Sequence, residues 1–134
     1  MPREKDPVRI AAIIDLLRDR AANAVMILPR AQDGLTTARG SLYHEEGDYG
    51  LSGLPFPKKY SLVKRAWLVQ LAIADGIEDG SAKLNSKSDR EYGEEYEVYL
   101  TYLGLDLYIK LMWIDSPDGN PFLELHEIKR WTRS

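Results

Sequence analysis

The stretch LDLYIKLMWIDSPDGNPFLELHE, residues 105–127, decides the fold that we expect for this chain. Apolar and polar residues alternate on both sides of the Pro-Asp-Gly sequence at 117–119, and a period of two is typical of strands with one buried face. Proline followed by Asp-Gly is typical of a tight turn. The stretch therefore predicts two antiparallel strands, over 105–114 and 122–128.

A third strand is expected just before this pair. The segment YEVYLTY, residues 96–102, alternates in the same way and is rich in residues with high β propensity. Leu103 and Gly104 can form the turn that joins it to the segment 105–114. The three segments together predict an antiparallel meander.

The turns fix a register, because a slip of one residue would move every side chain of a strand to the other face. In the first hairpin the expected pairs are Glu97–Lys110, Val98–Ile109, Tyr99–Tyr108 and Leu100–Leu107. In the second hairpin the expected pairs are Lys110–His126 and Leu111–Leu125.

This register gives the meander two unlike faces. The expected core face consists of Val98, Leu100, Leu107, Ile109, Leu111, Trp113, Leu123 and Leu125. The expected polar face consists of Glu97, Tyr99, Tyr108, Lys110, Met112, Glu124 and His126. Helices would cover the first face and leave the second one open, as is common for antiparallel sheets.

Two helices are expected to supply that cover. An Asp-Pro start followed by apolar residues at helical spacing predicts a helix over 7–22. Ser61 can cap a second helix over 62–75, which Gly76 would end.

The remaining segments are less regular. A short apolar run at 24–28 predicts a buried strand. The segment 31–60 is rich in glycine and proline and is expected to be irregular, with an edge strand over 36–43. The polar segment 78–95 is expected to form a loop.

The order of these elements predicts a single α+β domain over 1–134. Two main helices would pack on one face of a small antiparallel sheet, which ends in a three-stranded meander.

Composition narrows the functional classes. The chain has 134 residues, a formal net charge of −3 and no cysteine, which excludes disulfides and thiolate chemistry. It begins without the apolar segment of a signal peptide, and no run approaches the roughly 18 apolar residues of a membrane span, so we expect a cytoplasmic protein that does not enter the membrane. An acidic balance also argues against a nucleic-acid partner, because phosphate neutralisation needs basic surface.

The polar face of the meander has two interpretations. It can be an ordinary solvated face, stabilised by cross-strand Glu–Lys and Tyr–Tyr pairs. It can also be a catalytic site, since His126 can act as an acid or base, Lys110 can stabilise an anion and Tyr108 can donate a hydrogen bond. Those three groups suit metal-free cleavage of RNA by its own 2′-hydroxyl.

The pattern LYIKL followed by LELHE resembles the C-terminal strands of the motility-quorum-sensing-regulator family of messenger-RNA interferase toxins, which have RelE-like folds. The resemblance implies roles in RNA cleavage for Tyr108, Lys110 and His126. It covers about 30 of the 134 residues. The chain departs from the family at a further glutamine, because Tyr96 stands near the expected place.

Other aromatic residues suggest recognition if they are exposed, or a cover over the core or the sheet edge if they are packed against it. Tyr43 and Tyr49 lie in the irregular segment, and Trp131 lies in a basic tail; each is a candidate binding residue, together with Tyr99 and Glu124 on the polar face. No motif for a nucleotide or cofactor occurs, and His44-Glu45-Glu46 lacks the spacing of a metal site, so we expect neither metal nor cofactor.

Two main hypotheses follow, and a small ligand-binding or isomerase-like domain is a third. The first is a binding module without catalysis, for which a protein partner or small-molecule ligand is favoured over nucleic acid. The alternative is a metal-independent endoribonuclease toxin that uses Tyr108, Lys110 and His126. An edge position for the strand at 122–128 would also allow a homodimer by edge pairing.

Overall fold

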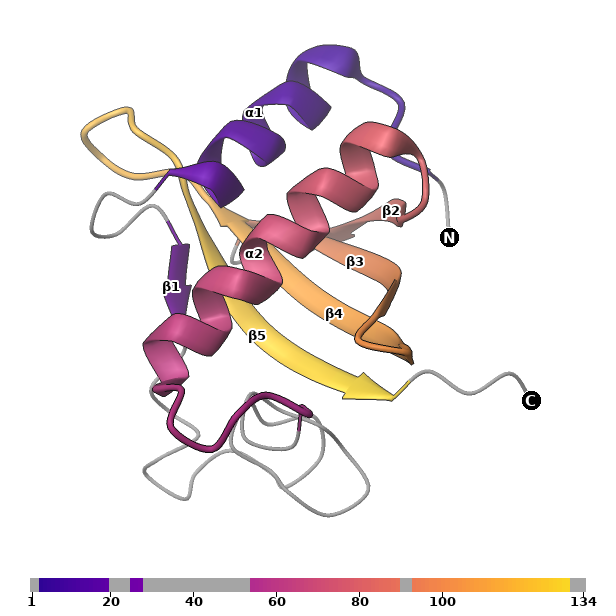
Figure 1. The fold of residues 1–134 in the computed structure, drawn as a ribbon. Coiled ribbons are helices and arrows are strands. Elements are labelled where there is room, and N and C mark those ends of the chain that lie inside the picture. The colour runs from indigo at the N-terminus through magenta and orange to yellow at the C-terminus, as the bar shows by residue number, and fades with distance from the viewer. Residues whose placement is uncertain (1–2, 20–24, 28–53, 90–92, 131–134) are drawn as a thin grey trace.

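The computed structural model describes residues 3–19, 25–27, 54–89 and 93–130 (Figure 1). Candidate residues Tyr43, Tyr49 and Trp131 and the strand expected at 36–43 lie outside these residues.

Five strands form one sheet in the order β1-β5-β4-β3-β2. Their bounds are β1 Val25–Ile27, β2 Lys83–Asp89, β3 Gly93–Tyr102, β4 Leu105–Ile114 and β5 Phe122–Arg130. The strands β2 to β5 form an antiparallel meander, and β1 pairs with β5 in parallel. The α+β class and the three C-terminal strands are as the sequence predicts.

The strand β2 corrects one prediction, because the polar segment 78–95 was expected to be a loop. Its sequence, KLNSKSD, lacks a clear apolar alternation, and among residues 83–86, whose side chains are described, Leu84 alone lies in the core. Within the described sheet β2 is an edge strand, and edge strands commonly carry lysine and other polar residues that discourage pairing with other molecules. The polar composition of this segment therefore gives no clear sign of a strand.

The helix α1, Pro7–Arg18, starts as expected and ends earlier than expected. Asp6 accepts a hydrogen bond from the Val8 backbone N–H at 2.9 Å, and proline occupies the first turn. The apolar stripe is buried through Ile13, Ile14 and Leu17. Asp19 has an extended backbone, which ends the helix at Arg18, so the predicted bound at residue 22 is wrong.

The helix α2, Leu62–Asp79, is longer than predicted. Ser61 caps it by accepting from the Lys64 backbone N–H at 3.1 Å. Gly76 does not end it; the helix continues one turn to Gly80, whose φ of 85° is left-handed. Gly76 instead allows close packing, because a Cβ at this position would lie 2.9 Å from Ala82 Cβ.

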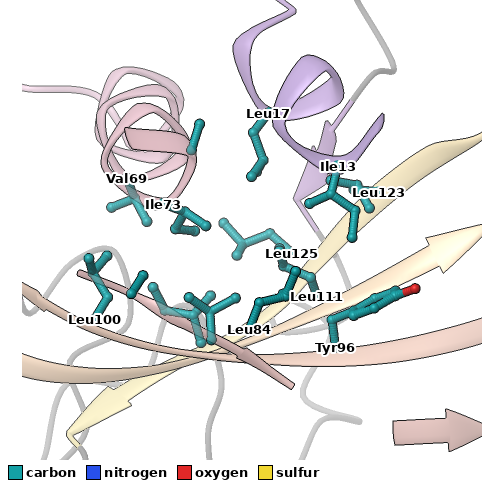
Figure 2. Close-up of a cluster of buried hydrophobic side chains, with 14 of the residues drawn as sticks. Ile13, Leu17, Val69, Ile73, Leu84, Tyr96, Leu100, Leu111, Leu123 and Leu125 are labelled. Carbon is teal, nitrogen blue, oxygen red and sulfur yellow. The ribbon is translucent and has the colours of Figure 1, made fainter. Parts of the chain in front are cut away.

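Both helices cover the same face of the sheet (Figure 1). Their buried side chains meet those of the strands in one core, as Figure 2 shows for Leu17 of α1, Ile73 of α2 and Leu125 of β5. Every residue predicted for the core face is at most 8% exposed. Neither described helix is long and apolar enough to cross a membrane.

The register of the first hairpin is confirmed at all four predicted pairs. In the second hairpin Leu111 lies opposite Leu125 as predicted, whereas Lys110 lies opposite Glu127 and not opposite His126. A β-bulge at this point gives β5 one extra residue, and a regular ladder was assumed in the prediction.

The strand β5 is also not an edge. It lies between β4 and β1, and the strands at the two edges of the described sheet are β1 and β2. The expected homodimer required residues 122–128 to form an edge strand, and they do not. The N-terminal segment partly covers the β2 edge, where Arg3 bridges Asn85 and the Glu4 N–H donates to the Leu84 carbonyl at 3.0 Å.

Candidate functional site

The candidate site is the sheet face opposite the helices. We define the polar face as Glu95, Glu97, Tyr99, Tyr108, Lys110, Met112, Glu124, His126, Glu127 and Lys129. Six of the seven residues predicted for this face belong to it by register, and the seventh, His126, is the unpaired residue of the bulge. Both described helices lie on the other side of the sheet, so neither covers it.

The bulge changes what this face contains. In a regular strand successive side chains alternate between faces. Here Leu125 and Ile128 are both buried in the core, with two residues between them, so His126 and Glu127 both fall on the polar face. The bulge thus adds a carboxylate next to the histidine and then restores the alternation, which puts Lys129 on the same face.

Lys110 is bracketed by carboxylates. Its Nζ lies 3.6 Å from Glu95 Oε1 and 3.8 Å from Glu127 Oε2. Glu127 also binds Lys129, with 2.9 Å between Oε1 and Nζ. The side chains of Glu95 and Glu127 are only 9% and 14% exposed, so these ion pairs are poorly screened by solvent.

Tyr108 also has a carboxylate partner on this face. Its hydroxyl donates to Glu97 Oε2 at 2.5 Å, and the Tyr99 ring packs edge-on with 5.5 Å between ring centroids. Burial raises the pKa of the Tyr108 hydroxyl well above its ordinary value, and the hydrogen bond to Glu97 and the nearby carboxylates raise this pKa further. Tyr108 is therefore a protonated donor at neutral pH.

His126 pairs with Glu124, the residue two positions earlier on the same strand. The imidazole Nε2 lies 3.0 Å from Glu124 Oε1, and the two side chains are 21% and 28% exposed. Within the described part of the chain, the hydrogen-bond partner of His126 is Glu124 and not Tyr108 or Lys110. The three predicted catalytic residues share one face, but each has its own carboxylate partner.

Sequence reasoning missed three members of the face: Glu95, Glu127 and Lys129. Glu95 lay in the segment expected to be a loop. Glu127 and Lys129 follow the bulge, where the assumed alternation places them on the wrong side. The one signal of an irregularity is in LELHEIK, where two polar residues separate Leu125 from Ile128.

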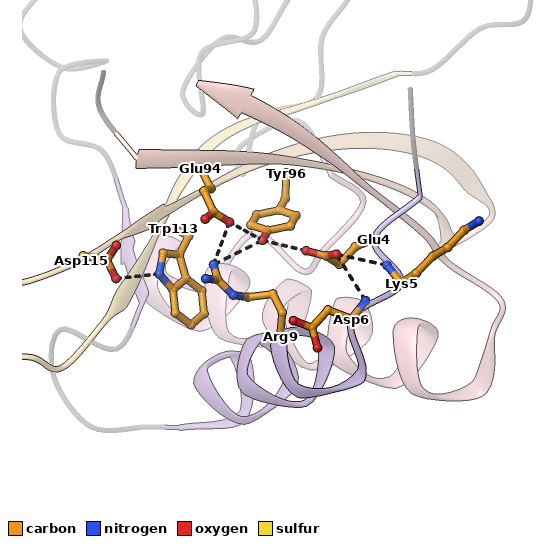
Figure 3. Close-up of polar contacts among 8 residues, drawn as sticks. All are labelled: Glu4, Lys5, Asp6, Arg9, Glu94, Tyr96, Trp113 and Asp115. Carbon is orange, nitrogen blue, oxygen red and sulfur yellow. Dashed lines mark hydrogen bonds and ion pairs between the residues drawn. The ribbon is translucent and has the colours of Figure 1, made fainter. Parts of the chain in front are cut away.

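A second polar cluster links α1 to the sheet (Figure 3). The Arg9 guanidinium stacks on the Trp113 ring at 4.0 Å and donates to Glu94 at 2.8 Å. The buried Tyr96 hydroxyl lies 2.8 Å from Glu94 Oε2 and 3.0 Å from Glu4 Oε1, and it accepts from Arg9 at 3.3 Å. Because its groups satisfy one another, this cluster serves as a structural lock between the N-terminal segment and the sheet.

Among the described residues no group of three or more histidine, aspartate and glutamate side chains could hold a metal ion. The sequence His44-Glu45-Glu46 lies outside those residues. Comparisons with protein-family models, curated proteins and solved structures found no match to this chain. The resemblance to the interferase toxins stays a prediction.

Proposed function

We propose that this chain is a binding module that holds a small polar ligand, or a polar side chain of a protein partner, on the polar face. The observation that carries the proposal is the β-bulge at His126, which places His126 and Glu127 side by side on this face. Bulges often occur next to functional sites, where they redirect a side chain.

The positions of the ionisable groups support binding. Tyr108, Lys110 and His126 are each oriented by a carboxylate, and each stands on a long strand within the meander. Side chains fixed in this way lose little conformational entropy when a ligand binds, and pre-organisation of this kind favours affinity.

The same geometry favours binding over RNA cleavage. An RNA phosphate that approached Lys110 would meet the carboxylates of Glu95 and Glu127, and one that approached Tyr108 would meet Glu97. Repulsion between like charges would oppose both approaches. The endoribonuclease alternative is therefore the weaker proposal, and it has a direct test.

The proposal can be tested by nuclear magnetic resonance on the 15N-labelled full chain. The probes are the N-acetyl methylamides of lysine, glutamate and tyrosine, inorganic phosphate, and a short single-stranded RNA. We expect at least one of the first three probes to shift amide signals of β4 and β5 around Lys110 and His126, without cleavage of the RNA.

Two variants separate the polar face from the rest of the molecule. Glu127→Gln should weaken the binding, because Glu127 pairs with both lysines of β4 and β5 on this face. Glu78→Gln is the matched control, since Glu78 pairs with Arg18 between the helices. Probes that shift only helix signals, or no signals, would contradict the proposal; cleaved RNA would favour the nuclease.

A further inference from the structure

The bulge leaves His126 without an opposite residue on β4. Lys110 and Leu111, which are adjacent on β4, pair with Glu127 and Leu125 of β5, and His126 stands between these two partners. No residue of β4 therefore lies directly across from the imidazole.

The contact with Glu124 also favours one tautomer of His126. An ionised carboxylate only accepts hydrogen bonds, so the ring nitrogen that faces it must carry the proton. That nitrogen is Nε2, which lies 3.0 Å from Glu124 Oε1. In a neutral imidazole the other nitrogen, Nδ1, then carries a lone pair and can only accept.

The charges beside His126 indicate which donor suits this lone pair. Glu124 and Glu127 flank it on β5, and the two lysines of the polar face, Lys110 and Lys129, are already paired with Glu95 and Glu127. A ligand that carries a positive charge together with N–H donors would be attracted to this place. An anionic ligand would meet repulsion and would find no donor on Nδ1.

We propose that Nδ1 of His126 is the ligand-contacting atom of the polar face, and that it accepts a hydrogen bond from a protonated primary amine. Glu124 is a positioning residue, because it holds the proton on Nε2. The inference rests on the proposed function and names its ligand class. The amine can come from a small molecule or from a lysine side chain of a protein.

The tautomer can be measured on the wild-type chain. A long-range 1H–15N spectrum of the imidazole at neutral pH should show a protonated Nε2 and a bare Nδ1. Glu124→Leu should give a mixture of the two tautomers. A proton on Nδ1 in the wild-type chain would overturn the inference without any ligand.

Binding is tested with two amine probes, n-butylamine for a free amine and the N-acetyl methylamide of lysine for a protein side chain. The control is the same lysine derivative with its Nε acetylated, which removes the charge and two of the donors. We expect the charged probes to bind and the acetylated control to bind at least about tenfold more weakly. Preference for butylamine indicates a small-molecule ligand; preference for the lysine derivative indicates a protein.

A matched pair of substitutions locates the contact atom. The amide of asparagine reaches the place of Nδ1, and the amide of glutamine reaches the place of Nε2. His126→Gln should therefore weaken amine binding at least about tenfold, and His126→Asn should weaken it less. Equal affinity of wild-type and His126→Gln chains would overturn the inference.

The two proposals fail in different ways. If the glutamate derivative or phosphate binds the polar face and the amines do not, the ligand class is wrong while the binding function survives. If neither the amines nor any other probe binds this face, the proposed function fails as well.

Discussion

Lys110 of β4 lies opposite Glu127 of β5, with 3.8 Å between Nζ and Oε2, although an unbroken ladder from the Leu111–Leu125 pair would place it opposite His126. Lys110 and Leu111 are adjacent on β4, but their partners on β5, Glu127 and Leu125, have one residue between them. The extra residue is the histidine, whose Nε2 lies 3.0 Å from Glu124 Oε1.

This register predicts which side chains are coupled in free energy. A double-mutant cycle with Lys110→Met and Glu127→Met should give a coupling of about 0.5–1 kcal/mol, the range for cross-strand and partly screened ion pairs. The matching cycle with Lys110→Met and His126→Ala should be additive within about 0.5 kcal/mol. Urea unfolding measures both, and stronger coupling of Lys110 to His126 would contradict the bulge.

The raised pKa of Tyr108 predicts that the protein loses stability in alkaline solution. Its pKa in the folded chain is raised above the ordinary value of 10.0, so the folded state keeps its proton after the unfolded chain has lost it. The contribution of Tyr108 is therefore complete below pH 10 and is lost as the pH rises toward the folded pKa. Above about pH 10.5 the free energy of unfolding should fall by about 1.4 kcal/mol per pH unit for such a tyrosine.

Tyr108→Phe supplies the check on this prediction. The variant should lose about 1 kcal/mol at neutral pH, because Glu97 no longer receives the hydroxyl hydrogen bond. Its stability should then fall less steeply than that of the wild-type chain in alkaline solution. Unfolding in urea at several pH values measures both slopes, and parallel slopes would show that Tyr108 ionises normally.

Arg9 is expected to stabilise the fold more than a typical surface arginine does. Arg9→Leu removes the stacking on Trp113 and the ion pair with Glu94, and we expect a loss of about 1–2 kcal/mol. Arg9→Lys should lose part of this, since lysine keeps the charge but not the planar stacking group. Arg18→Leu is the control, because the partners of Arg18, Asp75 and Glu78, are well exposed. If Arg18→Leu lowered the free energy of unfolding as much as Arg9→Leu does, the contacts of Arg9 would have no special role in stability.

Gly76 is expected to be required by packing rather than by helix termination. Alanine is normally favoured over glycine in a helix by about 1 kcal/mol. Here Gly76→Ala should instead destabilise by about 1 kcal/mol, because its Cβ would lie 2.9 Å from Ala82 Cβ and the elements would have to separate. Adding Ala82→Gly should restore most of the loss, and a Gly76→Ala variant that is more stable than the wild-type chain would contradict this reason.

The parts of the fold that could be predicted are those with strong local signals. The strand β4 follows strict alternation and has the predicted bounds, and the cap at Asp6 correctly marks the start of α1. The strand β2 could not be found in this way, because an edge strand with a polar outer face has little apolar pattern. The last turn of α2 was missed because tertiary packing against Ala82 outweighs the tendency of Gly76 to end a helix.

The candidate site was predicted in outline. Register arguments placed Tyr99, Tyr108 and Lys110 on one face because the β3–β4 hairpin is regular. At the bulge the predicted pair of Lys110 and His126 is wrong, and Glu127 was not expected on this face. A bulge depends on how two strands fit the core on both sides of it, and one strand's sequence carries only a weak sign of that fit.

Deletion of residue 126 is the most direct test, because we propose that the bulge serves binding and that the core does not need it. Without His126, Leu125 would still face Leu111, and Glu127 would still face Lys110, now in a regular ladder. We predict a chain that folds cooperatively, with stability at least equal to that of the wild-type chain, and that no longer binds the amine probes. An unfolded deletion variant, or a folded variant that still binds the amine probes, would contradict this role of the bulge.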